Sequence, residues 1–127
     1  LGMNVVDRII HSINWLARKE AGSINKLSDQ QRKQVQKIYL EDFSVNPDRQ
    51  INKMCAFLDT QLSSFSPTAF KKLGIPATYY RAEYNRKLAK IKAEAGAKSV
   101  ELLMEMAEVY ERDFRKSCGA AFDQVLM

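Results

Sequence analysis

Residues that could do chemistry are few in this chain, and they are widely separated. His11 is the only histidine among 127 residues. Catalysis by a cysteine and histidine pair could therefore use only this imidazole, and no neighbouring residues have the spacing of a metal site or of a catalytic triad. We expect His11 to lie on the helix surface or partly buried beside an apolar face.

The two cysteines, Cys55 and Cys118, each fall on the apolar side of an expected helix. Cys55 lies beside Met54 and Leu58, and Cys118 lies between Phe114 and Phe122. There is no C-x-x-C pair, so zinc binding and thioredoxin-like chemistry are not indicated. Two alternatives stay open. In the first, both thiols are free and buried, and the protein is in a reducing compartment. In the second, the protein is in an oxidising compartment, and a disulfide closes the long loop and adds about 4 kcal/mol to the stability of the fold.

The remaining candidate groups also fail to suggest an enzyme. Glu41 and Asp42 adjoin an expected helix end, where we expect them to face solvent rather than to form an acid and base pair. The sequence has no glycine-rich phosphate loop. We therefore predict a protein without catalytic residues, cofactor or metal.

Composition is typical of one small helical domain. The chain is 46% hydrophobic and 28% charged, and it has only five glycines and three prolines for loops and turns. Its net charge of +5 gives a mild preference for anionic partners. We expect a single domain over residues 1–127, with Leu1 and Gly2 as a tag remnant ahead of Met3. No apolar run could span a membrane, so we expect cytoplasmic localisation, or periplasmic or secreted if the cysteines are joined.

Hydrophobic spacing predicts an all-α bundle of four to five helices. The first runs from residue 4 to 20 and stops before Gly22. The second covers 29–43, after a capping box of Ser28 and Gln31. The third begins at Asn46 and Pro47 and extends to residue 62, and a short helix from Ser66 and Pro67 ends before Gly74.

The last expected element is a long helix over about 77–118, with Gly96 in its middle. At 100° per residue, an apolar stripe keeps its phase across this glycine, because Ile91 and Leu102 are eleven residues, or about three turns, apart. We therefore favour one continuous helix. The alternative is a hairpin broken near Gly96, with this glycine as a left-handed C-cap or Ser99 capping a new helix.

Charge changes sign along this segment. Residues 77–98 carry six basic and two acidic side chains, for +4, and residues 99–113 carry five acidic and one basic, for −4. The segment is therefore complementary to itself when antiparallel, whether it folds back as a hairpin or pairs with a second copy. Pairing two copies around Gly96 would set Lys87 opposite Glu105 and Glu94 opposite Lys98. We expect an interaction surface along the stripe, formed by Tyr80, Tyr84, Lys87, Leu88, Ile91, Glu94, Lys98 and Glu105.

These patterns lead to two functional hypotheses. We favour a non-catalytic protein-interaction module, of the adaptor, inhibitor, immunity or chaperone-like kind, that forms a homodimer and could bind a second protein. The alternative is a nucleic-acid-binding regulator with a helix-turn-helix around residues 29–63 and a basic patch over 71–92. In it, Arg49, Gln50 and Lys53 would face the groove, and Lys71, Lys72 and Arg81 would contact phosphate.

Overall fold

The computed structural model describes residues 2–64 and 66–127, so Leu1 of the expected tag remnant lies outside it. Over this part of the chain the protein is an all-α bundle, as predicted. Its helices are α1 (Val5–Asn25), α2 (Asp29–Arg32), α3 (Leu40–Val45), α4 (Pro47–Phe57), α5 (Ser66–Lys72), α6 (Arg81–Glu94), α7 (Ala97–Cys118) and α8 (Phe122–Val125). An isolated bridge between Tyr79 and Leu126 is the only β-type pairing in the described ranges.

The first helix starts where the sequence predicts but continues further. The Asn4 side chain accepts a hydrogen bond from the Asp7 N–H at 2.8 Å, which satisfies one of the free donors at the helix start. The helix passes through Gly22 and ends at Asn25. An interior glycine costs about 1 kcal/mol, and here it does not end the helix.

The prediction of one helix over 29–43 is wrong, although its start is confirmed. Ser28 and Gln31 form the expected capping box at the start of α2. The helix ends after Arg32, and no helix covers residues 33–39. Tyr39 is extended and buried, and its ring packs edge-on against Tyr110 and Phe114. Packing of this ring outweighs the local helical pattern, and a separate α3 follows it.

The start of α4 follows the predicted proline signal. Pro47 occupies the first turn, where its missing N–H removes no helical hydrogen bond. Asn46 stands at the N-cap position, but its side chain donates to Asp42 instead of capping the helix. Gly74 follows the short α5 with a φ of +67°, a conformation that favours glycine.

The chain turns at Gly96, so the prediction of a continuous helix over 77–118 is wrong and the hairpin alternative is confirmed. Ala95 ends α6 with a ψ of 148°, and Gly96 is extended with φ −67° and ψ 152°. Gly96 is therefore the N-cap of α7 and not a left-handed C-cap. Ser99 does not begin this helix either, because α7 already starts at Ala97.

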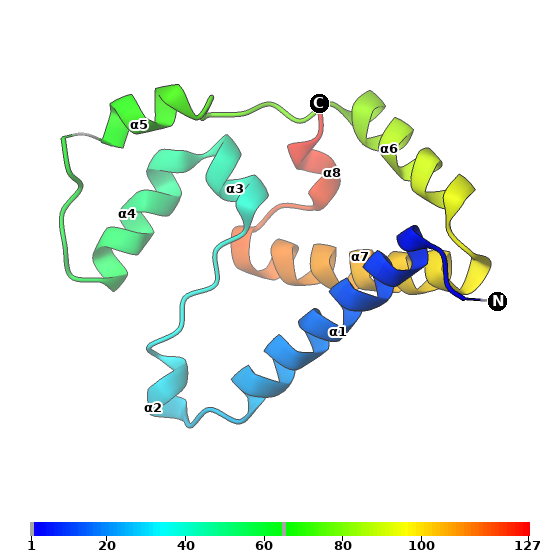
Figure 1. Cartoon of the computed structure of the whole chain (residues 1–127). Helices are drawn as coiled ribbons and strands as arrows, with labels where there is room; N and C mark the ends of the chain where they lie inside the picture. The colour runs from blue at the N-terminus through cyan, green and yellow to red at the C-terminus, as the bar shows by residue number, and fades with distance from the viewer. Residues whose placement is uncertain (1, 65) are drawn as a thin grey trace.

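Figure 1 shows α6 and α7 as the two arms of a V, with α1 lying across α7 and α8 inside the open end. The Tyr84 ring of α6 and the Tyr110 ring of α7 both contact Phe122 of α8. The buried large apolar side chains among the described residues are Ile10, Tyr39, Ile51 and Phe114, and Phe114 is fully buried. They come from four different parts of the chain and form a small core.

This core leaves a large surface exposed to solvent. The accessible area is 9786 Å². A monomer of 14.5 kDa typically exposes about 6,900 Å², so the chain exposes about 2,900 Å² more than that.

No helix among the described residues combines the length and the apolar character needed to cross a membrane.

Candidate interaction surface

His11 lies at the corner where α1 meets the turn between α6 and α7. Three side chains of α1 and its cap contact this turn. The Asn4 amide donates to the Glu94 carbonyl at 2.8 Å, and the Asp7 carboxylate accepts from the Gly96 N–H at 2.8 Å. His11 Nε2 lies 3.5 Å from Ser99 Oγ. The start of α1 therefore satisfies backbone groups at the end of one helix and the beginning of the next.

The corner contains serine, histidine and aspartate, but not in the order that nucleophilic catalysis requires. In a triad the aspartate orients the histidine, which takes the serine proton. Here the Ser99 hydroxyl hydrogen-bonds Asp7 directly, and Ser99 is only 4% exposed. This bond, followed by the one from the Gly96 N–H, lowers the pKa of Asp7. Asp7 of α1 therefore caps the start of α7, and the three side chains do not form a catalytic triad.

A second polar cluster surrounds Asp42 and corrects the prediction that this residue faces solvent. Asp42 is 3% exposed, and its carboxylate accepts from the side chains of Arg49, Gln50 and Asn46. Cys118 at the end of α7 also hydrogen-bonds Asp42. The cluster therefore ties α3, α4 and α7 together.

Glu41 is also turned inward, since its carboxylate accepts from the Tyr110 hydroxyl at 2.5 Å. Burial, together with this bond to a carboxylate, raises the pKa of Tyr110. Glu41 and Asp42 thus have separate partners and do not share a site.

Both cysteines are free and half-buried, so the structure contains no bond between Cys55 and Cys118. Burial, followed by the hydrogen bond to Asp42, raises the pKa of the Cys118 thiol. A raised pKa lowers the fraction of reactive thiolate at neutral pH. Cys118 therefore has the character of a structural thiol.

The interaction surface predicted on residues 80–105 is divided by the turn and is partly covered. Leu88 and Ile91 are half-buried, and the Tyr84 ring lies 5.7 Å from Phe122. The polar members of the predicted surface, Lys87, Glu94, Lys98 and Glu105, are exposed, as is Tyr80. Pairing two copies around Gly96 required a continuous helix, so that alignment is excluded.

The charges of α6 and α7 pair mainly within each helix. Lys87 bonds Glu83 at 2.8 Å, and Arg115 bonds Glu111 at 2.9 Å. No ion pair links α6 to α7 in the described ranges. The change of charge sign at Gly96 therefore marks two exposed surfaces of opposite charge rather than a zipped hairpin.

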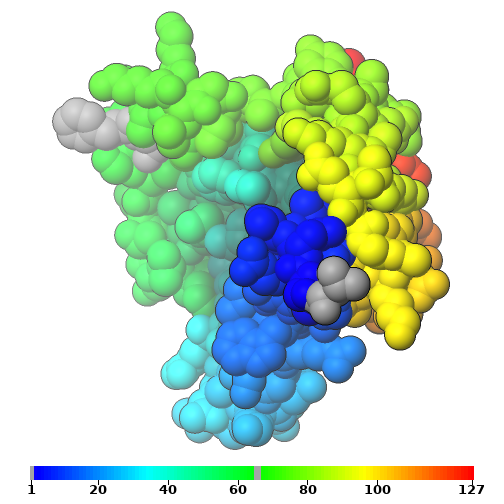
Figure 2. All heavy atoms as spheres, turned by 45° about the vertical axis from the view of Figure 1, so that its right-hand side comes forward, coloured from blue at the N-terminus to red at the C-terminus, as the bar shows by residue number. Residues whose placement is uncertain are grey.

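A row of exposed large apolar side chains lies on α1, the first helix that hydrophobic spacing predicts. Val5, Ile9, Ile13 and Leu16 are each between 51% and 60% exposed. We call these four residues the open face of α1. Figure 2 shows α1, in blue, uncovered on the side toward the viewer, with the turn between α6 and α7 beside it in yellow.

The width of the apolar arc on α1 was the available signal for this open face. At 100° per residue, apolar residues extend over about 160° from Val5 to Ala21. Ile10 is the member that is buried, on the side facing α7. One neighbouring helix covers only part of such an arc, and the open face is the uncovered remainder.

A shallow depression of about 530 Å³ adjoins the open face. Its lining comes from one side of α1 and the preceding segment, namely Met3, Arg8, His11, Ser12, Trp15 and Leu16. The Trp15 ring is 59% exposed, and the Lys19 ammonium lies 5.5 Å from its centre. An exposed indole suits contact with a protein partner, because tryptophan is enriched at protein interfaces relative to the rest of the surface.

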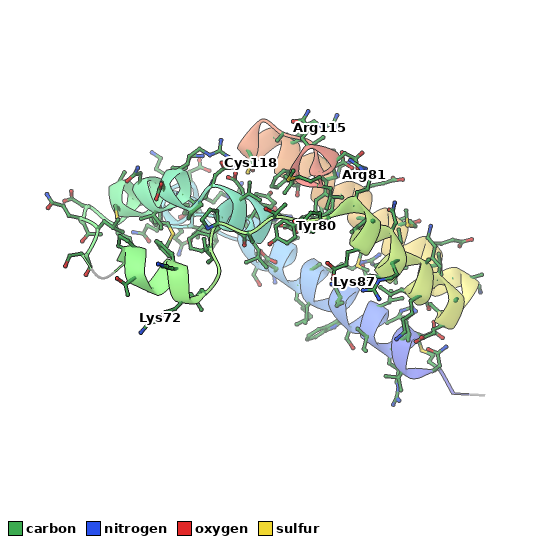
Figure 3. All side chains as sticks on the ribbon, turned by 90° about the horizontal axis from the view of Figure 1, so that it is seen from above. Lys72, Tyr80, Arg81, Lys87, Arg115 and Cys118 are labelled. Atoms are coloured by element: carbon green, nitrogen blue, oxygen red, sulfur yellow. The ribbon has the colours of Figure 1, made fainter. Side chains whose placement is uncertain are left out.

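Three of the six residues proposed for nucleic-acid contact bond other parts of the chain, and Lys53, Lys71 and Lys72 are exposed. Gln50 is buried against Asp42, and Arg49 is bonded to the same carboxylate. Arg81 pairs with Asp123 at 2.8 Å and also donates to its carbonyl oxygen. Lys72 projects away from α5 in Figure 3, where Tyr80 and Arg81 mark the entry to α6. No helix-turn-helix forms within 29–63, because α3 has six residues and only Asn46 separates it from α4.

Comparison of the chain with protein-family models, with curated proteins and with solved structures finds no match.

Proposed function

We propose that this chain is a non-catalytic protein-interaction module that binds another protein through the open face of α1. The supporting observation is the exposure of four large apolar side chains in one line on a helix of 21 residues. Contiguous exposed apolar surface is costly in water and is typical of protein-binding sites. Helix recognition of this kind uses apolar anchors at spacings of three and four residues, as in Val5, Ile9, Ile13 and Leu16.

The rest of α1 is built to hold this face in position. Hydrogen bonds from Asn4 and to Asp7 fix the start of the helix to the turn between α6 and α7, and Ile10 packs inward. A binding helix that is already ordered loses less conformational entropy on association than a disordered segment does.

Site-specific photo-crosslinking in the cells that naturally make this protein tests the proposal. A benzophenone amino acid replaces Ile13 on the open face, and a matched variant carries it at Lys92, an exposed position on α6. We expect light-dependent protein adducts from position 13 and none from position 92. A second variant carries the benzophenone at Ile9, also on the open face. If neither position 13 nor position 9 gives adducts, the proposal is contradicted.

A further inference from the structure

We propose that the partner of the open face is a second copy of this chain, bound so that the two α1 helices run antiparallel. This inference depends on the proposed function, because it names the occupant of the same surface. It makes α1 the centre of a two-fold symmetric dimer, with each α7 packed behind its own α1.

The exposed area is large enough for such an interface. The chain exposes about 2,900 Å² more than a typical monomer of its mass. A standard interface removes about 800 Å² from each partner, and permanent homodimers remove about 1,000 to 2,500 Å² from each. The excess is larger than either area, so the chain exposes enough surface for a dimer interface.

The open face is complementary to itself when the second helix is reversed. Its four side chains fall within an arc of about 80° at 100° per residue. An alignment that places Ile9 opposite Ile13 of the second copy repeats the same contact on the other side of the two-fold axis. The ends of the face then meet small or apolar residues, with Val5 opposite Ala17 and Leu16 opposite Val6.

The charge of Glu20 favours the antiparallel direction over the parallel one. Glu20 lies in line with the open face, and reversal brings it near the start of α1 in the second copy, where the helix dipole favours an acid. A parallel pair would instead set Glu20 against Glu20.

Sedimentation velocity of the purified full chain tests the dimer. We expect a species of twice the 14.5 kDa chain mass at about 10 µM protein. Ile13→Lys should raise the dimer dissociation constant about a hundredfold, since the symmetric interface then contains two unpaired ammonium groups. The matched control, Val109→Lys, places the same charge at a position 47% exposed on α7 and should leave the dimer intact. Circular dichroism of both variants tests whether they remain helical.

Mixing two variants tests the direction of the helices. Ile9→Glu and Ile13→Lys should each weaken the dimer alone, and their mixture should restore it, because antiparallel pairing sets the new acid opposite the new base. A parallel dimer would instead be restored by mixing Ile9→Glu with Ile9→Lys, and that result would overturn the antiparallel arrangement.

The two proposals can fail separately. A chain that sediments as a monomer up to about 100 µM overturns the self-pairing. If position 13 then crosslinks to a different protein in cells, the open face is still a binding surface and only its occupant was wrong. A monomer without crosslinks overturns both.

Discussion

The buried carboxylate of Asp42 offers the sharpest test of how this fold is held together. Asp42→Ala removes the acceptor shared by Gln50, Arg49 and Asn46. The Gln50 amide is 4% exposed, and leaving it without an acceptor costs about 1 to 3 kcal/mol. The Arg49 side chain is 46% exposed, so water replaces most of its lost interaction. When the weaker Asn46 contact is added, we expect Asp42→Ala to lower the free energy of unfolding by about 3 kcal/mol.

Urea unfolding followed by circular dichroism measures this loss. With a slope of about 2 kcal/mol per molar urea, a loss of about 3 kcal/mol lowers the midpoint by about 1.5 M. Protein concentration must be the same for all variants, because the proposed dimer would make the apparent stability depend on it. Glu108→Ala is the control, since it removes an exposed carboxylate of α7 and should change stability by less than about 0.5 kcal/mol.

A double variant separates the cluster from simple loss of a side chain. Asp42→Ala combined with Gln50→Ala removes both the acceptor and the stranded donor. The free energy of unfolding that the double variant loses should be smaller than the sum of the two single losses by about 1 to 2 kcal/mol. An Asp42→Ala midpoint within about 0.3 M of the unchanged protein would refute the view that this carboxylate joins α3 and α4.

Three further predictions concern the turn and the thiols. Gly96→Ala should change the free energy of unfolding by less than about 0.5 kcal/mol in thermal melts, because φ is −67° and the added Cβ would lie 3.6 Å from the Asp7 oxygens. The folded-state pKa of Asp7 is lowered, so its stabilising contribution is present at neutral pH and is lost as the pH falls below about 4. Asp7→Asn should therefore reduce the difference between the urea midpoints at pH 7 and pH 3. An unchanged difference would contradict the view that the Asp7 carboxylate stabilises the start of α7. Cys118 should react with a thiol reagent much more slowly in the folded protein than in urea, because its pKa is raised by burial, and rapid labelling of the folded chain would contradict its position beside Asp42.

Local sequence signals predicted the fold where the partners of each residue are close along the chain. The capping box of Ser28 and Gln31 and the start of α4 at Pro47 are both as expected. These features depend on residues within one turn, so neighbours in the sequence determine them. The all-α class could be inferred for the same reason.

The turn at Gly96 could not be predicted, because the groups that stabilise it are far away in sequence. Asn4 and Asp7 bond Glu94 and Gly96 across separations of 90 and 89 residues. Nothing around Gly96 indicates this support, and the apolar stripe on either side keeps its phase whether or not the helix is broken. The continuous helix was favoured for that reason, and the predicted interaction surface was placed along it.

The open face was missed for a related reason. Spacing identified an apolar side on α1, but spacing does not show how much of that side another helix covers. Ile10 and Ile13 carry the same side chain, yet only Ile10 is buried. The difference follows from how α7 lies across α1, which depends on the corner made by Asn4 and Asp7.

The long separation between α1 and its supports also bears on synthesis of the chain. Ribosomes add about 5 to 20 residues each second, so α1 emerges about 5 to 20 s before the residues around Gly96 that fix its first turn. During that interval both the inner side of α1, at Ile10, and its open face are without cover. A nascent chain of this kind is exposed to premature association between neighbouring ribosomes on one message, and a chaperone that shields α1 would prevent it.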